Sequence, residues 1–414
     1  MTKIQFEKVC SLSVKQLFRI GFDLALVSLS PIVSWFVLSI ILDSRLINIF
    51  SITYPLQFVW LMMRDIFGVG ANLVAVRTKN PKTVDAGIFI GAIFSGVIFG
   101  LVAIHIDKFI SFMNAEPQIY RDFCFYISLQ LWIQLVFCLI LDKLYYQDKN
   151  KLANKYSSLF NLLNFVVLIG TSLVVKNPKI IIATTLASIL IFVILIFAKE
   201  VRKISFRFNI FRAIKTNSMD FGENAVLFFV YLFGIGEAFS FGEEYALAIT
   251  FATLITDIQW DVATAIQTKA KIDISKKRMN FHESFRNAYV LILVLILSSI
   301  CAFVGMKGFY NLNLILAMIF TGIEYFAYCF YPQYRLKLDF LQLKFSAKTA
   351  TFIKISAMVF RLILILSIGS LTPFALNIAQ VLAQLYQVVF VNIVFHENYR
   401  ILRNGRAIRK ALKK

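Results

Sequence analysis

The chain of 414 residues is 59% hydrophobic and only 16% charged. This composition excludes an ordinary soluble globular protein, which is about 45–50% apolar and about 25% charged. The net charge of +20 comes from short basic loops between apolar segments, so we expect membrane lipids and no nucleic acid as partners. The five scattered cysteines predict neither a disulfide framework nor a metal site.

Twelve apolar segments of about 18–24 residues follow one another along the chain, and each is long enough to cross a hydrocarbon core of about 30 Å as a helix. They cover approximately residues 21–42, 51–75, 87–106, 123–141, 157–175, 180–198, 220–238, 245–267, 288–305, 311–332, 350–369 and 373–394. The pattern predicts an all-α polytopic membrane protein of about twelve transmembrane helices.

The basic residues predict its orientation. Most of the 43 Lys and Arg residues fall in the two terminal segments and in alternate loops on the same side of the membrane. The positive-inside rule places this side in the cytoplasm. Both termini are therefore expected in the cytoplasm, with the protein in the cell membrane.

The longest basic connection, residues 199–219, lies midway along the chain and divides it into two halves of six segments. The second segment of each half carries an acid at the same offset, Asp65 in the first half and Asp257 in the second. These features predict two six-helix bundles, residues 1–205 and 206–414, related by a pseudo-twofold axis along the membrane normal with a cavity between them.

Ionisable residues within the segments are the candidate functional residues. Arg64 and Asp65 lie near the middle of the second segment, where a charge costs at least about 2.5 kcal/mol. Asp257 and Asp261 are one turn apart, so we expect a coupled acid pair of the kind that proton coupling needs. The alternative is that these acids only neutralise cations buried in the bundle.

Further candidates lie in the second half: Glu223 near the inner end of the seventh segment, Glu324 in the tenth and Arg361 in the eleventh. Lys354 lies about two turns nearer the cytoplasm than Arg361, so its long side chain can reach the membrane surface. Arg361 is too deep for that. It needs either an internal acid, for which we favour Glu324, or a bound anion.

Motifs for enzymatic chemistry are absent from the sequence. It contains no P-loop and no Ser/His/Asp or metal-ligand cluster in its loops. We therefore expect no enzyme and no cofactor, and transport driven by an ion gradient or by the gradient of the substrate itself.

Three stretches resemble the multidrug and toxic compound extrusion (MATE) family, within the multidrug/oligosaccharidyl-lipid/polysaccharide flippase superfamily. The first is LSIILDSRLINIFSITYPL, in which Asp43 takes the place of the family's acid. The second is GVGANLVAVRTKNPK, which runs into a basic turn. The third is DKLYYQDKNKLANKYSSLFNLLNFVVLI, in which Asn164 takes the position of the family's cation-site asparagine. Leu168 stands where many members carry an acid one turn later.

The resemblance implies a secondary antiporter that exports organic, often cationic, compounds in exchange for H⁺ or Na⁺ by alternating access, acting as a monomer. A flippase for a lipid-linked oligosaccharide or polysaccharide precursor is the alternative, because a pyrophosphate cargo suits buried cations. A receptor or scaffold that transports nothing fits charged spans and an internal repeat less well. The residues expected to couple cations or protons, or to line the cavity, are Asp43, Asp65, Asn164, Glu223, Asp257, Asp261 and Glu324, with Arg64 and Arg361 as buried cations.

Overall fold

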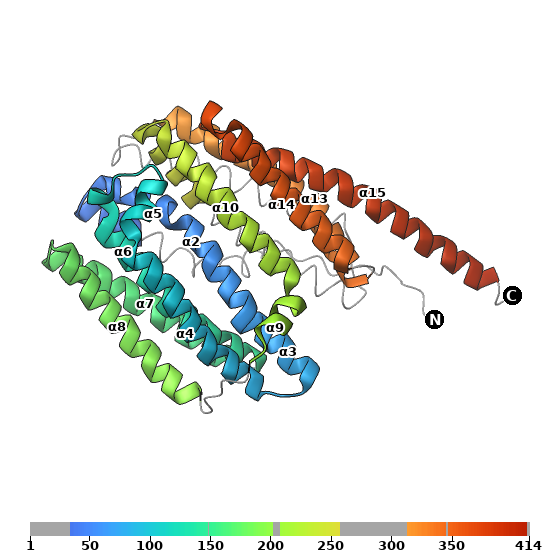
Figure 1. Ribbon diagram of the computed structural model, residues 1–414, viewed down its shortest axis with the longest axis horizontal. Coiled ribbons are helices and arrows are strands. Elements are labelled where there is room, and N and C mark those ends of the chain that lie inside the picture. The colour runs from blue at the N-terminus through green and yellow to red at the C-terminus, as the bar shows by residue number, and fades with distance from the viewer. Residues whose placement is uncertain (1–33, 148, 202–207, 257–312, 345–346, 412–414) are drawn as a thin grey trace.

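The computed structural model describes residues 34–256 and 313–411, apart from residues 148, 202–207 and 345–346. The regular elements in these ranges are all helices (Figure 1). The amino-terminal elements are η1 (Ser44–Asn48), α2 (Ile49–Arg64), η2 (Asp65–Gly70), α3 (Ala71–Thr78), α4 (Lys82–Ile104), α5 (Ile106–Phe112), α6 (Pro117–Tyr146), α7 (Asn150–Val174) and α8 (Pro178–Glu200). The carboxy-terminal elements are α9 (Ile210–Thr216), α10 (Ser218–Ser240), α13 (Leu314–Lys344), α14 (Ala347–Ile368), η3 (Gly369–Leu371) and α15 (Ala375–Ala411).

Eight helices within the described ranges are long and apolar enough to cross a membrane. They are Ser44–Thr78, Lys82–Ile104, Pro117–Tyr146, Lys151–Val174, Pro178–Glu200, Asp220–Ser240, Lys348–Leu371 and Ala375–His396. These helices coincide with the second to seventh, eleventh and twelfth predicted segments. The prediction of an all-helical, multi-pass membrane protein is therefore confirmed.

The other predicted segments are covered in part. The tenth falls within α13, whose apolar portion is the shorter Leu314–Ala327. Residues 34–41 and 243–256 are helical in the first and eighth segments, and the ninth lies outside the described residues. The total of twelve spans, the division into residues 1–205 and 206–414 and the pseudo-twofold axis stay predictions.

Local sequence explains where several helices begin and end. Pro117 and Pro178 occupy the first turns of α6 and α8, where a missing backbone N–H costs nothing. Asn177 and Asn209 cap α8 and α9 by accepting hydrogen bonds from the backbone N–H groups of the first turn. Lys79 adopts a left-handed conformation, φ 52°, and ends α3.

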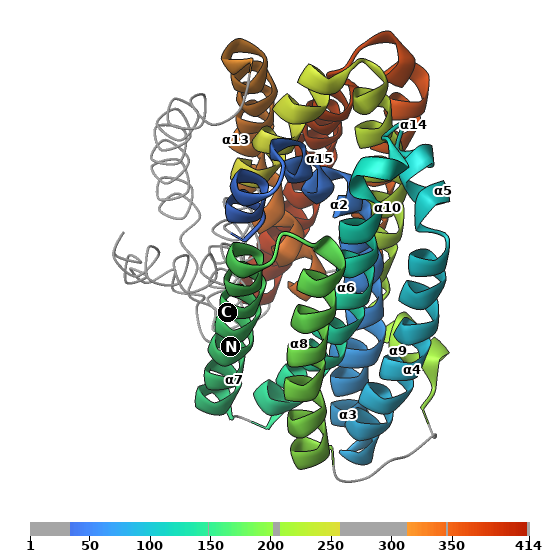
Figure 2. The same ribbon diagram turned by 90° about the vertical axis from the view of Figure 1, so that its left-hand side faces the viewer.

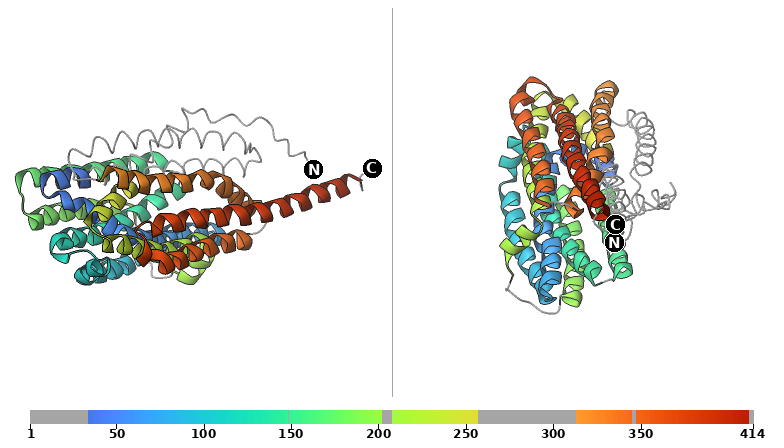
Figure 3. Two further views of the ribbon diagram at one scale, coloured as in Figure 1. Left: turned by 90° about the horizontal axis from the view of Figure 1, so that it is seen from above. Right: turned by 90° about the vertical axis from the view of Figure 1, so that its right-hand side faces the viewer.

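The helices form two neighbouring groups that run roughly alongside one another (Figures 1 and 2). In the first group, α2 and α4 pack on α6, and α8 packs on both α6 and α7. In the second group, α14 packs on α10, α13 and α15, and α13 packs on α15. The contact between α2 and α10 joins the two groups. Viewed from above, α15 extends beyond the other helices (Figure 3).

Large apolar side chains cover the outward faces of both groups. Val97 on α4, Ile194 on α8 and Ile363 on α14 are all exposed. A soluble protein would bury such continuous apolar faces, whereas hydrocarbon solvates them. The exposed faces therefore fit helices that are surrounded by lipid.

The two groups share their most extensive core at one end of the described helices, and toward α3 the cluster around Phe67 also includes Ala213 on α9 and packs against Phe221 on α10. Near η1, a single apolar cluster combines residues of both groups, including Ile110 on α5, Ile235 on α10 and Leu376 on α15. Toward α3, the described residues instead form two separate clusters, one around Phe67 and Leu139 and the other on α13, α14 and α15. We call these two ends the η1 end and the α3 end.

Candidate binding surface along α10

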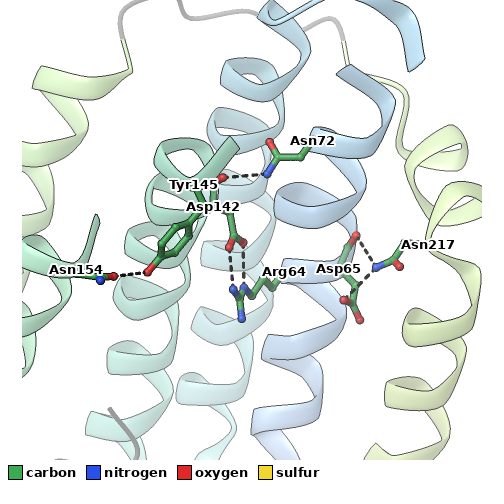
Figure 4. Close-up of polar contacts among 7 residues, drawn as sticks. All are labelled: Arg64, Asp65, Asn72, Asp142, Tyr145, Asn154 and Asn217. Carbon is green, nitrogen blue, oxygen red and sulfur yellow. Dashed lines mark hydrogen bonds and ion pairs between the residues drawn. The ribbon is translucent and has the colours of Figure 1, made fainter. Parts of the chain in front are cut away.

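The second span is interrupted at its two ionisable residues. The α-helical pattern stops after Arg64, and Asp65–Gly70 forms the π-helical segment η2 before α3 resumes. Such wider turns change which neighbours successive side chains face and are common at functional sites. Figure 4 shows Arg64 and Asp65 directed toward different helices, α6 and α10.

Arg64 is neutralised within the first group of helices. Its Nε and Nη2 atoms donate to Asp142 Oδ2 and Oδ1 on α6, at 2.9 and 2.7 Å (Figure 4). Asn72 Nδ2 donates to the backbone carbonyl of Asp142 at 3.1 Å. A Cβ at Gly68 would lie 2.5 Å from Asp142 Oδ2, so this close approach requires glycine. The geometry gives Arg64 an internal acidic partner.

Asp65 faces the opposite way and connects the two groups of helices. Its Oδ1 atom accepts a hydrogen bond from Asn217 Nδ2 at 3.1 Å, and its Oδ2 atom accepts one from Asn224 Nδ2 at 2.8 Å. Asn217 occupies the position before the first turn of α10, and Asn224 lies two turns further along the helix. The Asp65 carboxylate is half-buried and receives donors only from uncharged amides among the described residues.

Lys354 on α14 also contacts α10, at two residues between Asn217 and Asn224. The sequence predicts that Lys354 reaches the membrane surface, but its side chain is only 1% exposed. Its Nζ atom lies 3.3 Å from Asp220 Oδ1 and also pairs with Glu223 Oε2. Two acids on α10 hold this cation inside the protein, because a buried ammonium group without such partners is costly.

Arg361 is buried without a carboxylate partner among the described residues. It is 5% exposed, its Nη2 atom donates to Gln380 Oε1 at 2.9 Å, and its Nε atom has no partner in the described part of the chain. Its guanidinium lies 5.0 Å from the ring centroid of Tyr231 on α10, a distance suited to a cation–π contact. The favoured pair of Arg361 with Glu324 is therefore not formed as a direct contact.

Glu324 on α13 instead makes a direct contact with an amide on α15. It is buried, and its Oε1 atom accepts a hydrogen bond from Asn377 Nδ2 at 2.9 Å. Tyr231, whose ring faces the Arg361 guanidinium, also stacks on Phe58 of α2, with ring centroids 4.9 Å apart. An aromatic contact thus links the first group of helices to the surroundings of Arg361.

The two residues assigned by family resemblance lie elsewhere. Asn164 is buried on α7 and accepts a hydrogen bond from the hydroxyl of Tyr126 at 3.1 Å, while Leu168 joins the apolar cluster. Asp43 caps η1 and pairs with Arg45 at 2.8 Å. This hydrogen-bonded pairing lowers the pKa of the Asp43 carboxyl. Asp257 and Asp261 lie outside the described residues.

One side of α10 therefore brings together three of the predicted site residues that the structure describes, Asp65, Glu223 and Arg361. At about 100° per residue, its polar and aromatic residues fall within about one third of the helix circumference. We call this set the α10 polar stripe: Asn217, Asp220, Glu223, Asn224 and Tyr231. It contacts Asp65 on one side and Lys354 and Arg361 on the other. Within the described residues, no cluster of His, Cys, Asp and Glu could hold a metal ion.

Sequence reasoning missed several residues of this arrangement. Asp142 was overlooked because the predicted fourth segment ended at residue 141, whereas α6 continues to Tyr146. Asn217, Asp220 and Asn224 precede or begin the seventh apolar segment. Their helical spacing is the signal that could have placed them on one face with Tyr231.

No family model matches the sequence, and no curated protein matches it. Several solved structures do match the chain. The outward-facing conformation of a multidrug resistance MATE family transporter of the MOP superfamily is 13% identical, covers 98% of this chain and 99% of its own, and has a TM-score of 0.64. An inward-facing conformation described in the same words is 11% identical, with coverages of 93% and 96% and a TM-score of 0.65. A MOP superfamily transporter from Pyrococcus furiosus, for which reverse polarity of the binding pocket is said to suggest a different function, is 12% identical, with coverages of 96% and 98% and a TM-score of 0.64.

Proposed function

From the fold that this chain shares with MATE family transporters of the MOP superfamily, we propose that it is a secondary active transporter. It exports organic compounds in exchange for H⁺ or Na⁺ by alternating access. The fold comparison supports this proposal because outward-facing and inward-facing transporter structures resemble the chain almost equally, with TM-scores of 0.64 and 0.65.

The observation that carries the proposal is the α10 polar stripe. Charges at membrane depth are retained when they face a bundle interior, pair with one another or serve transport. Here Asp65 on η2 bonds to Asn217 and Asn224 where the two groups of helices meet, and Asp220 and Glu223 pair with Lys354 within the second group. Relative motion of the groups would exchange the partners of Asp65 for water, an ion or a substrate. The α10 polar stripe thus provides polar groups that could bind an ion or a substrate when the two groups of helices move apart.

The two groups of helices meet differently at their two ends. The positive-inside rule assigns the η1 end to the outside and both termini to the cytoplasm. The groups share an extensive apolar core at the η1 end, and at the α3 end they meet through the hydrogen bonds of Asp65 with Asn217 and Asn224 and through Phe221 on α10. In this orientation the outer side is closed by apolar packing.

Acids on several helices are the candidates for ion coupling. Asp65 and Glu223 contact the α10 polar stripe or belong to it, and Glu324 lies buried beside Asn377. Asp257 and Asp261 belong to the same proposal on the basis of their one-turn spacing. A carboxylate that exchanges a hydrogen-bond partner for a proton or Na⁺ links ion binding to helix movement.

A flippase for a lipid-linked glycan precursor is the second candidate, and Arg361 favours it. A buried guanidinium without a carboxylate partner in the described chain suits a phosphate-bearing cargo. Organic cations, the often-exported class that the resemblance implies, would instead bind to the acids of the α10 polar stripe.

Reconstitution tests the proposal. Purified protein in liposomes with an imposed H⁺ or Na⁺ gradient should accumulate a fluorescent organic cation against its concentration gradient, and ionophores should abolish the accumulation. Asp65→Asn should lower the rate, whereas Asn154→Ala, which removes a hydrogen bond between α6 and α7, should leave it unchanged. Uptake that ignores both gradients would argue against antiport, and scrambling of a lipid-linked glycan without a gradient would favour the flippase.

A further inference from the structure

Arg361 interacts electrostatically with the Glu324 carboxylate, but no carboxylate contacts it directly among the described residues. Gln380 accepts one hydrogen bond from its Nη2 atom, and the Tyr231 ring covers the guanidinium. The Nε atom is buried and has no acceptor among the described residues. Leaving a buried donor without an acceptor is costly, and the cost is larger for a charged donor. This part of the protein therefore lacks an acceptor, and an anionic group is the best acceptor for a guanidinium.

On the neighbouring face of α15, two buried hydrogen-bond acceptors lack donors among the described residues. Gln380, Gln384 and Gln387 recur at helical spacing on one face, and all are at most 7% exposed. Gln384 Oε1 and Gln387 Oε1 are buried without a donor among the described residues. Amide oxygens accept hydrogen bonds from hydroxyl or amine groups. A molecule that satisfied these unpaired groups would donate hydrogen bonds to the glutamines of α15 and place a negative charge beside Arg361.

The other buried cation nearby is already paired. Lys354 lies two turns away from Arg361 on α14 and contacts Asp220 and Glu223. The acids of α10 thus neutralise Lys354, whereas Arg361 still has an unused hydrogen-bond donor. We therefore assign a structural role to Lys354 and a binding role to Arg361.

We propose that Arg361, Gln384 and Gln387 form a binding site for a hydroxylated organic anion, a sugar acid or a sugar phosphate, on the face of α15 that packs toward α14. The inference rests on the proposed function, because it names the class of compound that the transporter would carry. Arg361 binds the carboxylate or phosphate group, and the two glutamines accept hydrogen bonds from sugar hydroxyls. Tyr231 holds the guanidinium plane in place.

Binding to the purified full-length protein in nanodiscs tests the proposal. The probes are sodium gluconate, glucose 1-phosphate and a polyprenyl-linked glucose phosphate, with glucose and sodium acetate as controls. Gluconate or either phosphate should bind, acetate should bind more weakly because it carries a charge but no hydroxyl groups, and glucose should not bind. Arg361→Gln should weaken binding by about tenfold or more, the loss expected when a charge-assisted hydrogen bond is removed. Preference for the polyprenyl form would identify a lipid head group as the source of the anion, and preference for the soluble forms would identify a free metabolite.

Matched variants keep the test decisive. Gln384→Leu and Gln387→Leu should weaken the binding of gluconate but not of acetate, because they remove acceptors for hydroxyl groups only. Arg121→Gln removes an exposed, paired cation on α6 and should change nothing. If Arg361→Gln does not fold, Arg361→Lys with the glutamine variants still tests the site. Equal binding by wild type and Arg361→Gln, or no binding of any anionic probe, would overturn the proposal.

The two proposals fail in different ways. Gradient-driven export of organic cations without binding of any anionic probe would remove the Arg361 site and leave the transporter in place. Anion binding that depends on Arg361, in liposomes that show no gradient-driven or lipid-scrambling activity, would keep the site and remove the transport function.

Discussion

Asp65 on η2 and Asn224 on α10 are 159 positions apart and share a hydrogen bond of 2.8 Å. This bond, with that of Asn217 to the same carboxylate, fastens the second span to the first helix of the other group. Hydrogen bonds to a charged group contribute about 1.5–3 kcal/mol each. The contact is therefore strong enough to bias the position of one group relative to the other.

Asp65→Asn should loosen this contact, because an amide offers one acceptor oxygen and turns its own N–H₂ group toward a donor. Spin labels at Val76→Cys and Phe229→Cys, which are exposed on α3 and α10, report the separation of the two groups by pulsed electron resonance in a background without the native cysteines. We expect a longer and broader distance distribution in Asp65→Asn. Asn154→Ala serves as the control. Identical distance distributions in the parent protein, Asp65→Asn and Asn154→Ala would show that Asp65 does not hold the two groups together.

Arg64 and Asp142 should behave as a coupled pair. Removing one partner of a buried ion pair costs about 3–5 kcal/mol, and the partial exposure of Arg64, 36%, reduces this to about 1–3 kcal/mol. Arg64→Gln and Asp142→Asn should each lower the thermal unfolding temperature in detergent. The double variant should lose less than the sum of the two changes. Strict additivity would show that the pair contributes nothing as a pair.

Gly68→Ala should destabilise the first group of helices. The new Cβ would lie 2.5 Å from Asp142 Oδ2 and 3.1 Å from Leu139 Cδ2, so the Arg64–Asp142 pair must shift at a cost of about 1–3 kcal/mol. Gly100→Ala on α4 is the matched control, because a Cβ at that position would meet no neighbouring atom within 4 Å. The two unfolding temperatures give the comparison, and equal values would contradict the close packing at Gly68.

Asp43 should act as a cap rather than as a coupling acid. Asparagine is an equally good cap, so Asp43→Asn should keep gradient-driven transport and its pH dependence, whereas Asp43→Ala should lose about 1 kcal/mol of stability. Because Arg45 lowers the pKa of Asp43, its ion pair adds stability above the ordinary pKa, and this stability disappears as the pH falls through the lowered value. The exposure of both side chains keeps that contribution small. A changed pH profile in Asp43→Asn would restore the coupling role.

The two ends of α10 provide a test of orientation. Ser218 and Ser240 are both exposed and lie at opposite ends of this helix. In intact cells, an impermeant thiol reagent should label Ser240→Cys but not Ser218→Cys, in a background without the native cysteines. Labelling of Ser218→Cys alone would reverse the proposed orientation.

Hydropathy and charge predicted most of the helices because membrane spans must be long, apolar and internally hydrogen-bonded. The same reasoning identified Arg64, Asp65 and Arg361 as residues that need partners. It did not identify the partners, because these depend on helix packing. Asp142 lies 78 positions from Arg64, and Asp220 lies 134 positions from Lys354. Apolar helices of similar length carry little information about which faces meet.

The unpaired state of Arg361 also could not be predicted. Glu324 lies on a neighbouring helix and was a reasonable partner by charge alone. In the structure Asn377 contacts the Glu324 carboxylate, and Gln380, one turn further along α15, contacts Arg361. The acid and the base thus contact two different amides of one helix and make no direct contact with each other. Only the relative rotation of α13, α14 and α15 decides this outcome.

The π-helical segment η2 lets the second span hold one residue more than a regular helix of the same rotation. A wider turn holds one residue more than an α-helical turn, whereas each residue added to an α-helix advances it by about 100°. Deleting a single residue between Asp65 and Gly70 would permit regular α-helix throughout, and α3 would keep its present orientation relative to α2 because the wider turn had absorbed that residue. Asn72 would then still face Asp142, which it contacts now. Homologous chains that lack one residue in this stretch should therefore have a regular second span that contacts the same neighbouring helix.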